Sequence, residues 1–404
     1  KEFLSLFRFK QKNLYPVDNR PEKELEVTVS GFTPRSYQKT ACSMIQEGKI
    51  DQRATLVMAT GAGKTILSAI ITANLGVPTI FYTYSLDLLE QTAQVYEKAL
   101  GIEIGRVGGR KFTIKPITIA SIQTVHSCWE KQDKRWKKLQ PFLEQTKLMF
   151  IDEGHMLGAE TIFNVAQITD AFYSYALTAT PYREDGKEIF IEAATGPTVE
   201  IISEKALLEE GHILPVHVEI LPVMHYKCRK KQYQKLYETE IVDHWERNRK
   251  VIKAIRKYPD KQVIVLVKSI YHGTKIAEII NVPFIHGSSS TKERQKAIED
   301  FKKKKINILI ASSILKQGID LPEAEVLILA HGGRSIVELL QKIGRVRRPA
   351  PGKTCGIVVD FYDYIQPYTE NDVFKAQSER RLALYRSQHY HIEGQGNTKK
   401  TGFD

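Results

Sequence analysis

The chain has 404 residues, which is too long for one ordinary domain and predicts two or three. Hydrophobic residues make up 42% and charged residues 26%, values typical of globular proteins with sizeable cores. No apolar run approaches the roughly 20 residues that a membrane-spanning helix needs. The 59 Lys and Arg outnumber the 47 Asp and Glu, and the formal charge of +12 favours a polyanionic partner, nucleic acid before membrane.

The four cysteines are scattered, and no pair has the spacing of a metal site or a disulfide framework: Cys42, Cys128, Cys228 and Cys355. We therefore expect no zinc and no iron–sulfur cluster, and a reduced setting that is cytoplasmic or nucleoid-associated. The apolar run at residues 3–7 is short and soon followed by Arg8, which predicts a strand of a small N-terminal module. The first residue is Lys1 and not Met, which suggests that the chain is trimmed there.

Nine short apolar runs alternate with helical stretches, a pattern that predicts parallel α/β layers. The first five runs lie at residues 54–59, 79–82, 117–121, 148–152 and 175–178. The other four lie at residues 263–267, 306–311, 326–330 and 355–360. Strands buried on both faces of a parallel sheet read as continuously apolar, as these runs do. The sequence therefore predicts two tandem parallel-sheet domains.

The stretch between the two series of strands predicts a connector. It holds a turn signal at residues 209–211, a Pro-bounded run at 214–222 and a basic helical stretch from 226 to 258. The chain end is polar from about residue 377, which predicts a helix and a frayed tail. We expect an N-terminal segment at 1–30, a first domain at 31–200, a connector with a basic helix at 201–258, a second domain at 259–370 and a C-terminal helix and tail at 371–404.

A glycine-rich loop lies between the first predicted strand and a helical pattern at residues 66–73. Such a loop lets backbone amides close around phosphate, while Lys64 reaches the outer phosphates and the Thr65 hydroxyl can hold Mg²⁺. Met58 stands where a P-loop usually begins with Gly, and the alternative is an ordinary glycine-rich turn. The spacing favours a nucleoside triphosphate site, with these nucleotide-binding residues: Thr60, Gly61, Ala62, Gly63, Lys64 and Thr65.

The fourth predicted strand runs into the acidic sequence Asp152-Glu153-Gly154-His155. Asp152 suits a second Mg²⁺ contact, and Glu153 can orient or deprotonate the attacking water. An Asp-Glu pair at a strand end is, by itself, equally typical of a helix cap. Beside a P-loop it indicates catalysis.

This acidic sequence resembles the DExH box of superfamily 2 helicases, and further blocks follow in the order of that family. The first half contains blocks at residues 33–38, 85–91, 121–124 and 177–181. The second half contains blocks at 285–287 with Arg294, 312–320 and 341–348. The resemblance covers residues 32 to 363. It implies two RecA-like domains that hold ATP and Mg²⁺ in the cleft between them, with a nucleic-acid strand across their outer face.

The resemblance also implies roles for single residues. Arg35 and Gln38 would bind the nucleotide, with Gln38 reading adenine, and so would Gly318 and Asp320. The residues that would contact nucleic acid are Ser85, Ser121, Gln123, Thr124, Gly287 and Ser312. The residues that would couple the ATP site to the nucleic-acid groove are His155, Thr178 and Thr180.

The last block, residues 341–348, resembles the arginine-bearing block of the family and implies catalytic roles for Gln341, Arg345 and Arg348. A loose phosphoryl transition state spreads charge over its oxygens, and an arginine from outside the P-loop can contribute roughly 10³–10⁵ in rate. Because both arginines lie on the second domain, closure of the domains would be coupled to ATP. The alternative for this block is a solvated basic turn.

Three details resemble the branch of XPB, UvsW and the type I and type III restriction motors: the short block at 35–38, the Gly154-His155 pair and Arg347-Arg348-Pro349. This resemblance implies a nucleic-acid-stimulated ATP hydrolase, a DNA helicase or translocase on duplex, branched or forked DNA that typically moves 3′ to 5′. Repair, recombination and replication are the matching processes. Tyr84 in place of Pro and Ser312 in place of Thr depart from the family pattern.

Three other functions stay open: an RNA helicase, a motor subunit that translocates without separating strands, and a binding protein that uses ATP only as a clamp. No oligomer is required for any of them. Residues 129–138 and 226–237 interleave aromatic and basic side chains, which predicts either nucleic-acid contacts or solvated helix faces with core aromatics. The lysine run at 302–305 predicts a solvated turn.

Overall fold

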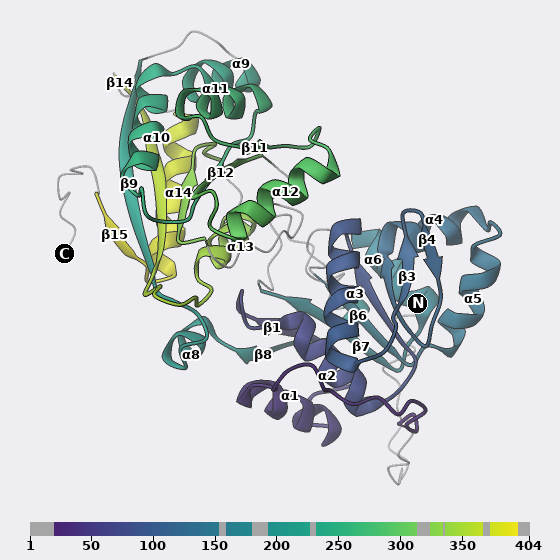
Figure 1. The fold of residues 1–404 in the computed structure, drawn as a ribbon. Helices are drawn as coiled ribbons and strands as arrows, with labels where there is room; N and C mark the ends of the chain where they lie inside the picture. The colour runs from purple at the N-terminus through teal and green to yellow at the C-terminus, as the bar shows by residue number, and fades with distance from the viewer. Residues whose placement is uncertain are drawn as a thin grey trace.

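A computed structural model describes residues 20–152, 159–179, 193–226, 232–312, 324–333, 336–366 and 372–394. These residues form two α/β domains, each built around its own sheet (Figure 1). The predicted class, tandem parallel-sheet domains, is confirmed. None of the described helices is both long enough and apolar enough to cross a membrane.

The first sheet, sheet A, has the strand order β4-β3-β5-β2-β6-β7-β1-β8. Neighbouring strands pair in parallel except β3 and β4, which pair antiparallel. Its central strands are buried along their whole length, which explains their continuously apolar sequences. The strands are β1 (Arg53–Met58), β2 (Thr79–Thr83), β3 (Gly105–Gly108), β4 (Lys111–Thr113), β5 (Ile117–Ser121), β6 (Leu148–Asp152), β7 (Tyr173–Thr178) and β8 (Thr198–Ile202).

Helices cover both faces of sheet A. One core cluster joins α1, α2 and α3 to one face, and another joins α4, α5 and α6 to the opposite face. Neighbouring side chains of β2 alternate between the two, with Phe81 in the first and Tyr82 in the second. The helices are α1 (Ser36–Gln46), α2 (Lys64–Leu75), α3 (Leu86–Leu100), α4 (Ile122–Lys131), α5 (Trp136–Gln145), α6 (Ala159–Thr169) and, after β8, α8 (Glu204–Glu209).

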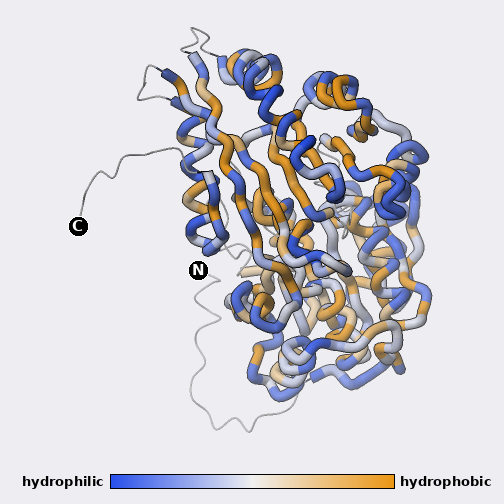
Figure 2. Tube along the Cα trace, turned by 60° about the vertical axis from the view of Figure 1, so that its left-hand side comes forward, coloured by the Kyte–Doolittle hydropathy of each residue, from blue (hydrophilic) through white to orange (hydrophobic). Residues whose placement is uncertain are grey.

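The second sheet, sheet B, has the order β11-β12-β10-β13-β14-β9-β15, and its strand pairs are all parallel. Figure 2 shows several strands as mostly hydrophobic traces, whereas the helices mix hydrophobic and hydrophilic residues. The strands are β9 (Val216–Tyr226), β10 (Val263–Leu266), β11 (Phe284–Ile285), β12 (Ile308–Ala311), β13 (Val326–Leu329), β14 (Gly356–Gln366) and β15 (His391–Glu393).

The helices of the second domain also divide between two core clusters. α12, α13 and α14 pack on one face of sheet B, and α10 and α11 pack on the other. A short helix continues into a π-helical turn, η2, ahead of α10. The bounds are α9 (Tyr233–Tyr237), η2 (Glu238–Val242), α10 (Trp245–Arg256), α11 (Ile270–Ile280), α12 (Thr291–Lys302), α13 (Ile336–Val346) and α14 (Val373–Ser387).

Two parts of the chain differ from the expectation. Residues 216–226, expected in the connector, form β9, which pairs with β14 over eleven residue pairs and so belongs to sheet B. Residues 391–393, expected in a frayed tail, form β15 on the outer edge of β9. In both cases the strand exists because of a partner that is remote in the sequence, which a local pattern does not reveal.

Candidate active site

The glycine-rich loop joins β1 to α2 at the carboxyl edge of sheet A. Gly61 and Gly63 have φ values of 92° and 75°, in the left-handed region that favours glycine. Gly63 is the N-cap of α2, and Lys64 and Thr65 are the first residues of that helix. The first backbone amides of a helix lack partners within the helix, so this terminus suits an anion. The predicted phosphate loop therefore has the conformation that its chemistry needs.

The upstream block at the start of α1 packs directly against this loop. Gln38 Nε2 donates to the carbonyl oxygens of Ala62, at 3.3 Å, and Gly63, at 3.5 Å, while its Oε1 accepts from the Arg35 amide at 3.0 Å. Arg35 Nη1 lies 3.4 Å from the Gly61 carbonyl oxygen. The structure thus brings both predicted nucleotide-binding residues of this block to the loop.

Tyr37 is a further residue of this contact that the sequence did not single out. Its hydroxyl donates to the Ala62 carbonyl at 2.6 Å and accepts from Arg35 Nη1 at 3.0 Å. Burial raises the pKa of this phenol, and the neighbouring Arg35 acts in the opposite direction. The neutral hydroxyl is therefore available to hold the loop.

Asp152 and Thr178 lie at the same edge of sheet A. Thr178 pairs with Val57 of β1, and Asp152 pairs with Leu177, so the ends of β6, β7 and β1 are aligned. Both side chains are buried. The structure places this carboxylate and hydroxyl beside the strand that leads into the phosphate loop. Glu153, His155 and Thr180 lie outside the described residues.

The second domain meets the phosphate loop through α13. A Cβ atom on Gly344 would overlap Thr60 Cγ2 and would lie 2.9 Å from Thr60 Cβ. The backbone of α13 therefore lies so close to the loop that a side chain at this position would have to displace Thr60. Arg345 lies next in the helix and Arg348 just beyond its end, so both are brought to the interface between the domains. Gln341 lies in the same helix, but its side chain is outside the described part.

Both arginines are partly desolvated in this interface. Burial lowers the pKa of Arg345 to about 10, with Tyr84 of the first domain acting in the opposite direction, and burial also lowers the pKa of Arg348. Desolvation disfavours the charged form, and a nearby anion favours it. The interface is therefore an environment in which a phosphate would stabilise two guanidinium groups.

Arg347, between these two arginines in sequence, has a different role. Its side chain is buried, forms an ion pair of 2.6 Å with Glu204 of α8 and donates to the Leu214 carbonyl at 3.1 Å. The Leu214 amide in turn donates to the Arg347 carbonyl at 2.8 Å. The guanidinium also lies over the ring of Tyr390, 5.4 Å from its centroid. Arg347 therefore holds the segment that links the domains, residues 212–214, against the end of α13.

That link also covers the phosphate loop. The His212 ring lies 5.9 Å from the Tyr37 ring in an edge-on contact. A Cβ atom on Gly61 would lie 3.0 Å from Ile213 Cγ2. Residues 212–214 thus contact both the first domain and the arginine block.

The residues of the first domain that were predicted to contact nucleic acid gather at the ends of β2 and β5, which are adjacent strands. Ser85 caps α3 by accepting from the Leu88 amide, and Ser121 caps α4 by accepting from the Thr124 amide. Gln123 Nε2 donates to the Tyr84 carbonyl at 2.9 Å and joins the two loops. The hydrogen bonds of these three side chains stabilise the loops that follow β2 and β5 at the carboxyl edge of sheet A.

In the second domain, Gly287 is exposed after β11, with open space around it. Ser312 is buried after β12, and its amide donates to the Ile285 carbonyl at 3.0 Å. Both lie at the carboxyl edge of sheet B. Gly318 and Asp320 lie outside the described residues.

The two aromatic and basic segments prove unlike one another. Trp136 is buried in the core under α5, so residues 129–138 fit the reading of a solvated helix face with a core aromatic. In the other segment Tyr237 is buried, whereas Tyr226 and Tyr233 are exposed. The lysines that follow α12 are exposed, as expected of a solvated turn.

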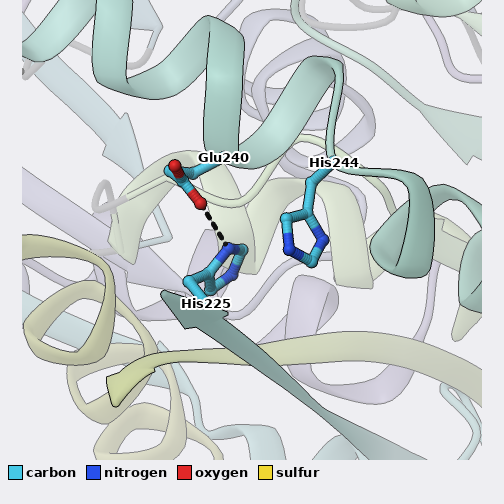
Figure 3. A group of neighbouring side chains, drawn as sticks. All are labelled: His225, Glu240 and His244. Carbon is cyan, nitrogen blue, oxygen red and sulfur yellow. Dashed lines mark hydrogen bonds and ion pairs between the residues drawn. The ribbon is translucent and has the colours of Figure 1, made fainter. Parts of the chain in front are cut away.

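A buried group in the second domain has the residue types of a metal site: His225, Glu240 and His244 (Figure 3). Both ring nitrogens of His225 already lie 3.0 Å from carboxylates, one from Glu240 and the other from Asp363. His244 Nδ1 accepts from the Arg247 amide at the start of α10. Because these atoms satisfy one another, we interpret the group as a buried hydrogen-bonded cluster that joins β9, η2, α10 and β14.

Comparison with known proteins matches both domains to families. Residues 31–183 match the Res subunit of type III restriction enzymes, and residues 246–350 match the helicase conserved C-terminal domain. Both families imply ATP-dependent activity. The chain is 28% identical to the DNA 3′-5′ helicase XPB of Kineococcus radiotolerans, over 89% of this chain and 64% of that protein. It is 26% identical to XPB of Mycobacterium tuberculosis, over 87% and 64%.

Further similarities point the same way. A protein named "Putative helicase 22", from the Sulfolobus islandicus filamentous virus, is 25% identical, over 93% of this chain and 71% of that protein. The fold is similar to that of the type ISP restriction-modification enzyme LlaBIII bound to DNA, with a TM-score of 0.63 and 16% identity over 88% of this chain and 30% of that one. It is also similar to Saccharomyces cerevisiae Dbp5, with a TM-score of 0.60 and 14% identity over 89% and 90%. The chain spans 64% of the length of the two XPB helicases. A restriction-motor family on the first domain, a helicase family on the second and the XPB relatives together support a superfamily 2 helicase in the branch of XPB and the restriction motors.

Proposed function

We propose that this chain is an ATP-driven motor on DNA, a nucleic-acid-stimulated ATPase that unwinds or translocates along duplex or branched DNA. The observation that carries the proposal is the contact between α13 and the glycine-rich loop, because it supports a site in which arginines of one domain reach phosphates held by the other. The XPB relatives are named DNA 3′-5′ helicases, which supports DNA as the track and 3′ to 5′ as the direction.

In this proposal the first domain binds the nucleotide. Gln38 and Arg35 hold the loop and the base, the amides at the start of α2 hold the phosphates, and Lys64 neutralises them. Thr65 and Asp152 would hold Mg²⁺, which prefers oxygen ligands and supplies charge neutralisation at the phosphates. The fit rests on a hydroxyl at the helix start and a buried carboxylate at the end of β6. Glu153 is the proposed base for the attacking water.

The second domain supplies the remaining charge. Arg345 and Arg348 would stabilise the transition state, with Gln341, Gly318 and Asp320 completing the nucleotide contacts. Hydrolysis breaks the bond to the terminal phosphate, and release of that phosphate would remove an anion that favours contact between α13 and the loop, so that the domains can separate and the strand can advance. The proposed coupling residues between the two sites are His155, Thr178 and Thr180.

An ATPase panel tests the proposal. Turnover is measured without nucleic acid and with single-stranded, duplex, forked and four-way DNA, each beside its RNA counterpart. We expect DNA to raise turnover. We expect Lys64→Ala to lower turnover by roughly a hundredfold or more, because the substitution removes the positive charge that would neutralise the transferred phosphate. The exposed Lys49→Ala serves as the matched control. Turnover of Lys64→Ala at the wild-type rate would refute the phosphate-loop assignment, and stimulation by RNA alone would refute DNA as the track.

Strand-displacement and triplex-displacement assays then separate unwinding from translocation. A helicase displaces a strand from forked DNA, whereas a pure translocase displaces only the third strand of a triplex. DNA binding without any stimulation of hydrolysis would contradict motor action and would favour an ATP-dependent clamp.

A further inference from the structure

Two neighbouring helices of the second domain, α10 and α11, each expose an aromatic ring near the end that starts at the carboxyl edge of sheet B. The strands of this sheet are parallel, so the chain leaves both β9 and β10 at this edge, before α10 and α11 respectively. Trp245 at the start of α10 is 68% exposed, and Tyr271 at the start of α11 is 59% exposed. A contiguous patch of exposed apolar side chains often marks an interaction site.

Each ring is paired with a cation. The Arg249 guanidinium carbon lies 5.3 Å from the centre of the Trp245 ring, and Lys275 Nζ lies 5.0 Å from the centre of the Tyr271 ring. Lys275 Nζ also lies 2.9 Å from the carboxylate of Asp243, two residues before Trp245. This lysine, in the second turn of α11, therefore links α11 to the segment just before α10, so the two rings lie on neighbouring helices. We name Trp245, Arg249, Tyr271 and Lys275 the aromatic–cation surface.

The charge around this surface selects the kind of partner. The only acidic residue of α10 is Glu246, and Lys250 already engages it at 2.9 Å, whereas the helix carries five basic residues. Of the five, Arg247 is buried against Asp363, and the other four are exposed or partly exposed. The exposed Lys268 follows β10 at the same edge. Such a basic surface with flat rings complements a polyanion that has flat bases.

We propose that the aromatic–cation surface is a stacking platform for single-stranded nucleic acid, separate from the helicase blocks. Bases stack on Trp245 and Tyr271, Arg249 neutralises a neighbouring phosphate, and Lys275, paired with Asp243, supports the Tyr271 ring. The inference rests on the proposed function, and it extends the track from Gly287 and Ser312 along the carboxyl edge of sheet B. Because every base has a stacking face, this contact is independent of sequence.

Fluorescence anisotropy of a labelled oligothymidylate, measured on the full chain without nucleotide, tests the platform. Trp245→Ala and Tyr271→Ala should each weaken binding about tenfold. Trp245→Phe and Tyr271→Phe keep a ring and should bind within about threefold of the wild type. The control is Ile279→Ala. Ile279 is an exposed residue of α11 that lies about 12 Å farther along the helix axis than Tyr271. Thermal unfolding of each variant verifies that it is folded.

Two further readouts separate stacking from a general loss of charge. Stacking on Trp245 should quench its fluorescence, and Trp245→Phe should lose this quenching while it still binds. Arg249→Gln should reduce the slope of log affinity against log salt by about 0.7, the value for one phosphate of a single strand.

The outcomes that overturn the proposal are distinct. If the wild type binds the oligonucleotide and both alanine variants bind as tightly, the platform is refuted while the proposed function stands. If the alanine variants instead lose self-association in sedimentation, the surface contacts a second copy and the platform is likewise refuted. If the wild type binds no nucleic acid in any form, the proposed function and the platform both fail.

Discussion

Gly344 shows how a single missing side chain can set the distance between two domains. Its backbone touches Thr60 of the phosphate loop, and a methyl group there would overlap the threonine side chain. The neighbouring Ile343 and Val346 are buried in the core of the second domain, so α13 is not free to move away by itself. A methyl group at this position must therefore displace either the Thr60 side chain or α13 itself, and a shift of α13 would withdraw the arginines from the loop.

We expect Gly344→Ala to lower kcat by at least about tenfold, because the arginines are withdrawn from a transition state to which they contribute strongly. Nucleotide binding by the first domain should change little. Steady-state kinetics with nucleotide titration measures both effects. The double variant Gly344→Ala, Thr60→Ser lacks the overlapping methyl group and should recover part of the rate. Unchanged kcat in Gly344→Ala would contradict the contact.

Arg348→Ala should lower kcat far more than it lowers nucleotide affinity, since a transition-state contact is lost while the loop and Gln38 remain. Arg348→Lys, which keeps the charge without the planar fork, should recover only part of the rate. Single-turnover hydrolysis and nucleotide titration distinguish these effects. A fall in affinity with kcat preserved would rule out the proposed role.

At the residue scale, the sequence predicted the site residues best where residues adjacent along the chain form the site. The phosphate loop follows from residues 60–65, and Asp152 from its place at the end of an apolar strand. The structural role of Arg347 was not predicted, because its partners, Glu204, Leu214 and Tyr390, are remote in sequence. The roles of Glu153 and Asp320 remain predictions.

At the element scale, a continuously apolar strand such as β6 was predicted to the residue, because burial on both faces leaves a plain signal. β9 was missed because its side chains alternate between buried and partly exposed and include a proline at 222. The antiparallel β3–β4 pair and the edge strand β15 are three or four residues long, too short for a periodic pattern.

The contact between α13 and the link is an element-scale feature that a single substitution can test. Arg347→Ala removes the ion pair with Glu204 and the bond to the Leu214 carbonyl, and the free energy of unfolding should fall by about 2 kcal/mol. Urea denaturation measures the change. Arg256→Ala, on the exposed end of α10, should change the free energy by less than about 0.5 kcal/mol. Equal effects of the two variants would contradict the fastening role.

At the scale of the whole molecule, buried histidines make stability depend on pH. Burial lowers the pKa of His272 to about 3, and burial also lowers the pKa values of His244 and His331. In the unfolded chain these histidines take up protons as the pH falls through about 6.5, whereas in the folded chain they stay neutral to a lower pH. Unfolding therefore takes up protons between pH 6.5 and 3, and stability is lost as the pH falls through this window.

We expect the free energy of unfolding to decrease from pH 7.5 to pH 5.5, by up to about 1.4 kcal/mol per pH unit below 6.5 for His272 alone. Urea denaturation at several pH values measures the slope. His272→Gln keeps a donor toward Asn248 and should reduce the slope, whereas the control His389→Asn, at an exposed position, should not. If the free energy of unfolding does not change over this pH range, the proposal that His272 is buried in its neutral form is contradicted.

The pairing of β9 with β14 also fixes the order in which the chain can fold during synthesis. Sheet A is complete once β8 has emerged, at Ile202, so the first domain can fold early from contiguous sequence. β9 emerges next, but Val216 must wait for Gly356, about 140 residues later, before its edge is covered. Until then an eleven-residue strand is left with open hydrogen-bonding groups, a template for mispairing with other chains. A nascent chain of this protein is therefore most exposed to aggregation while its second half is being synthesised.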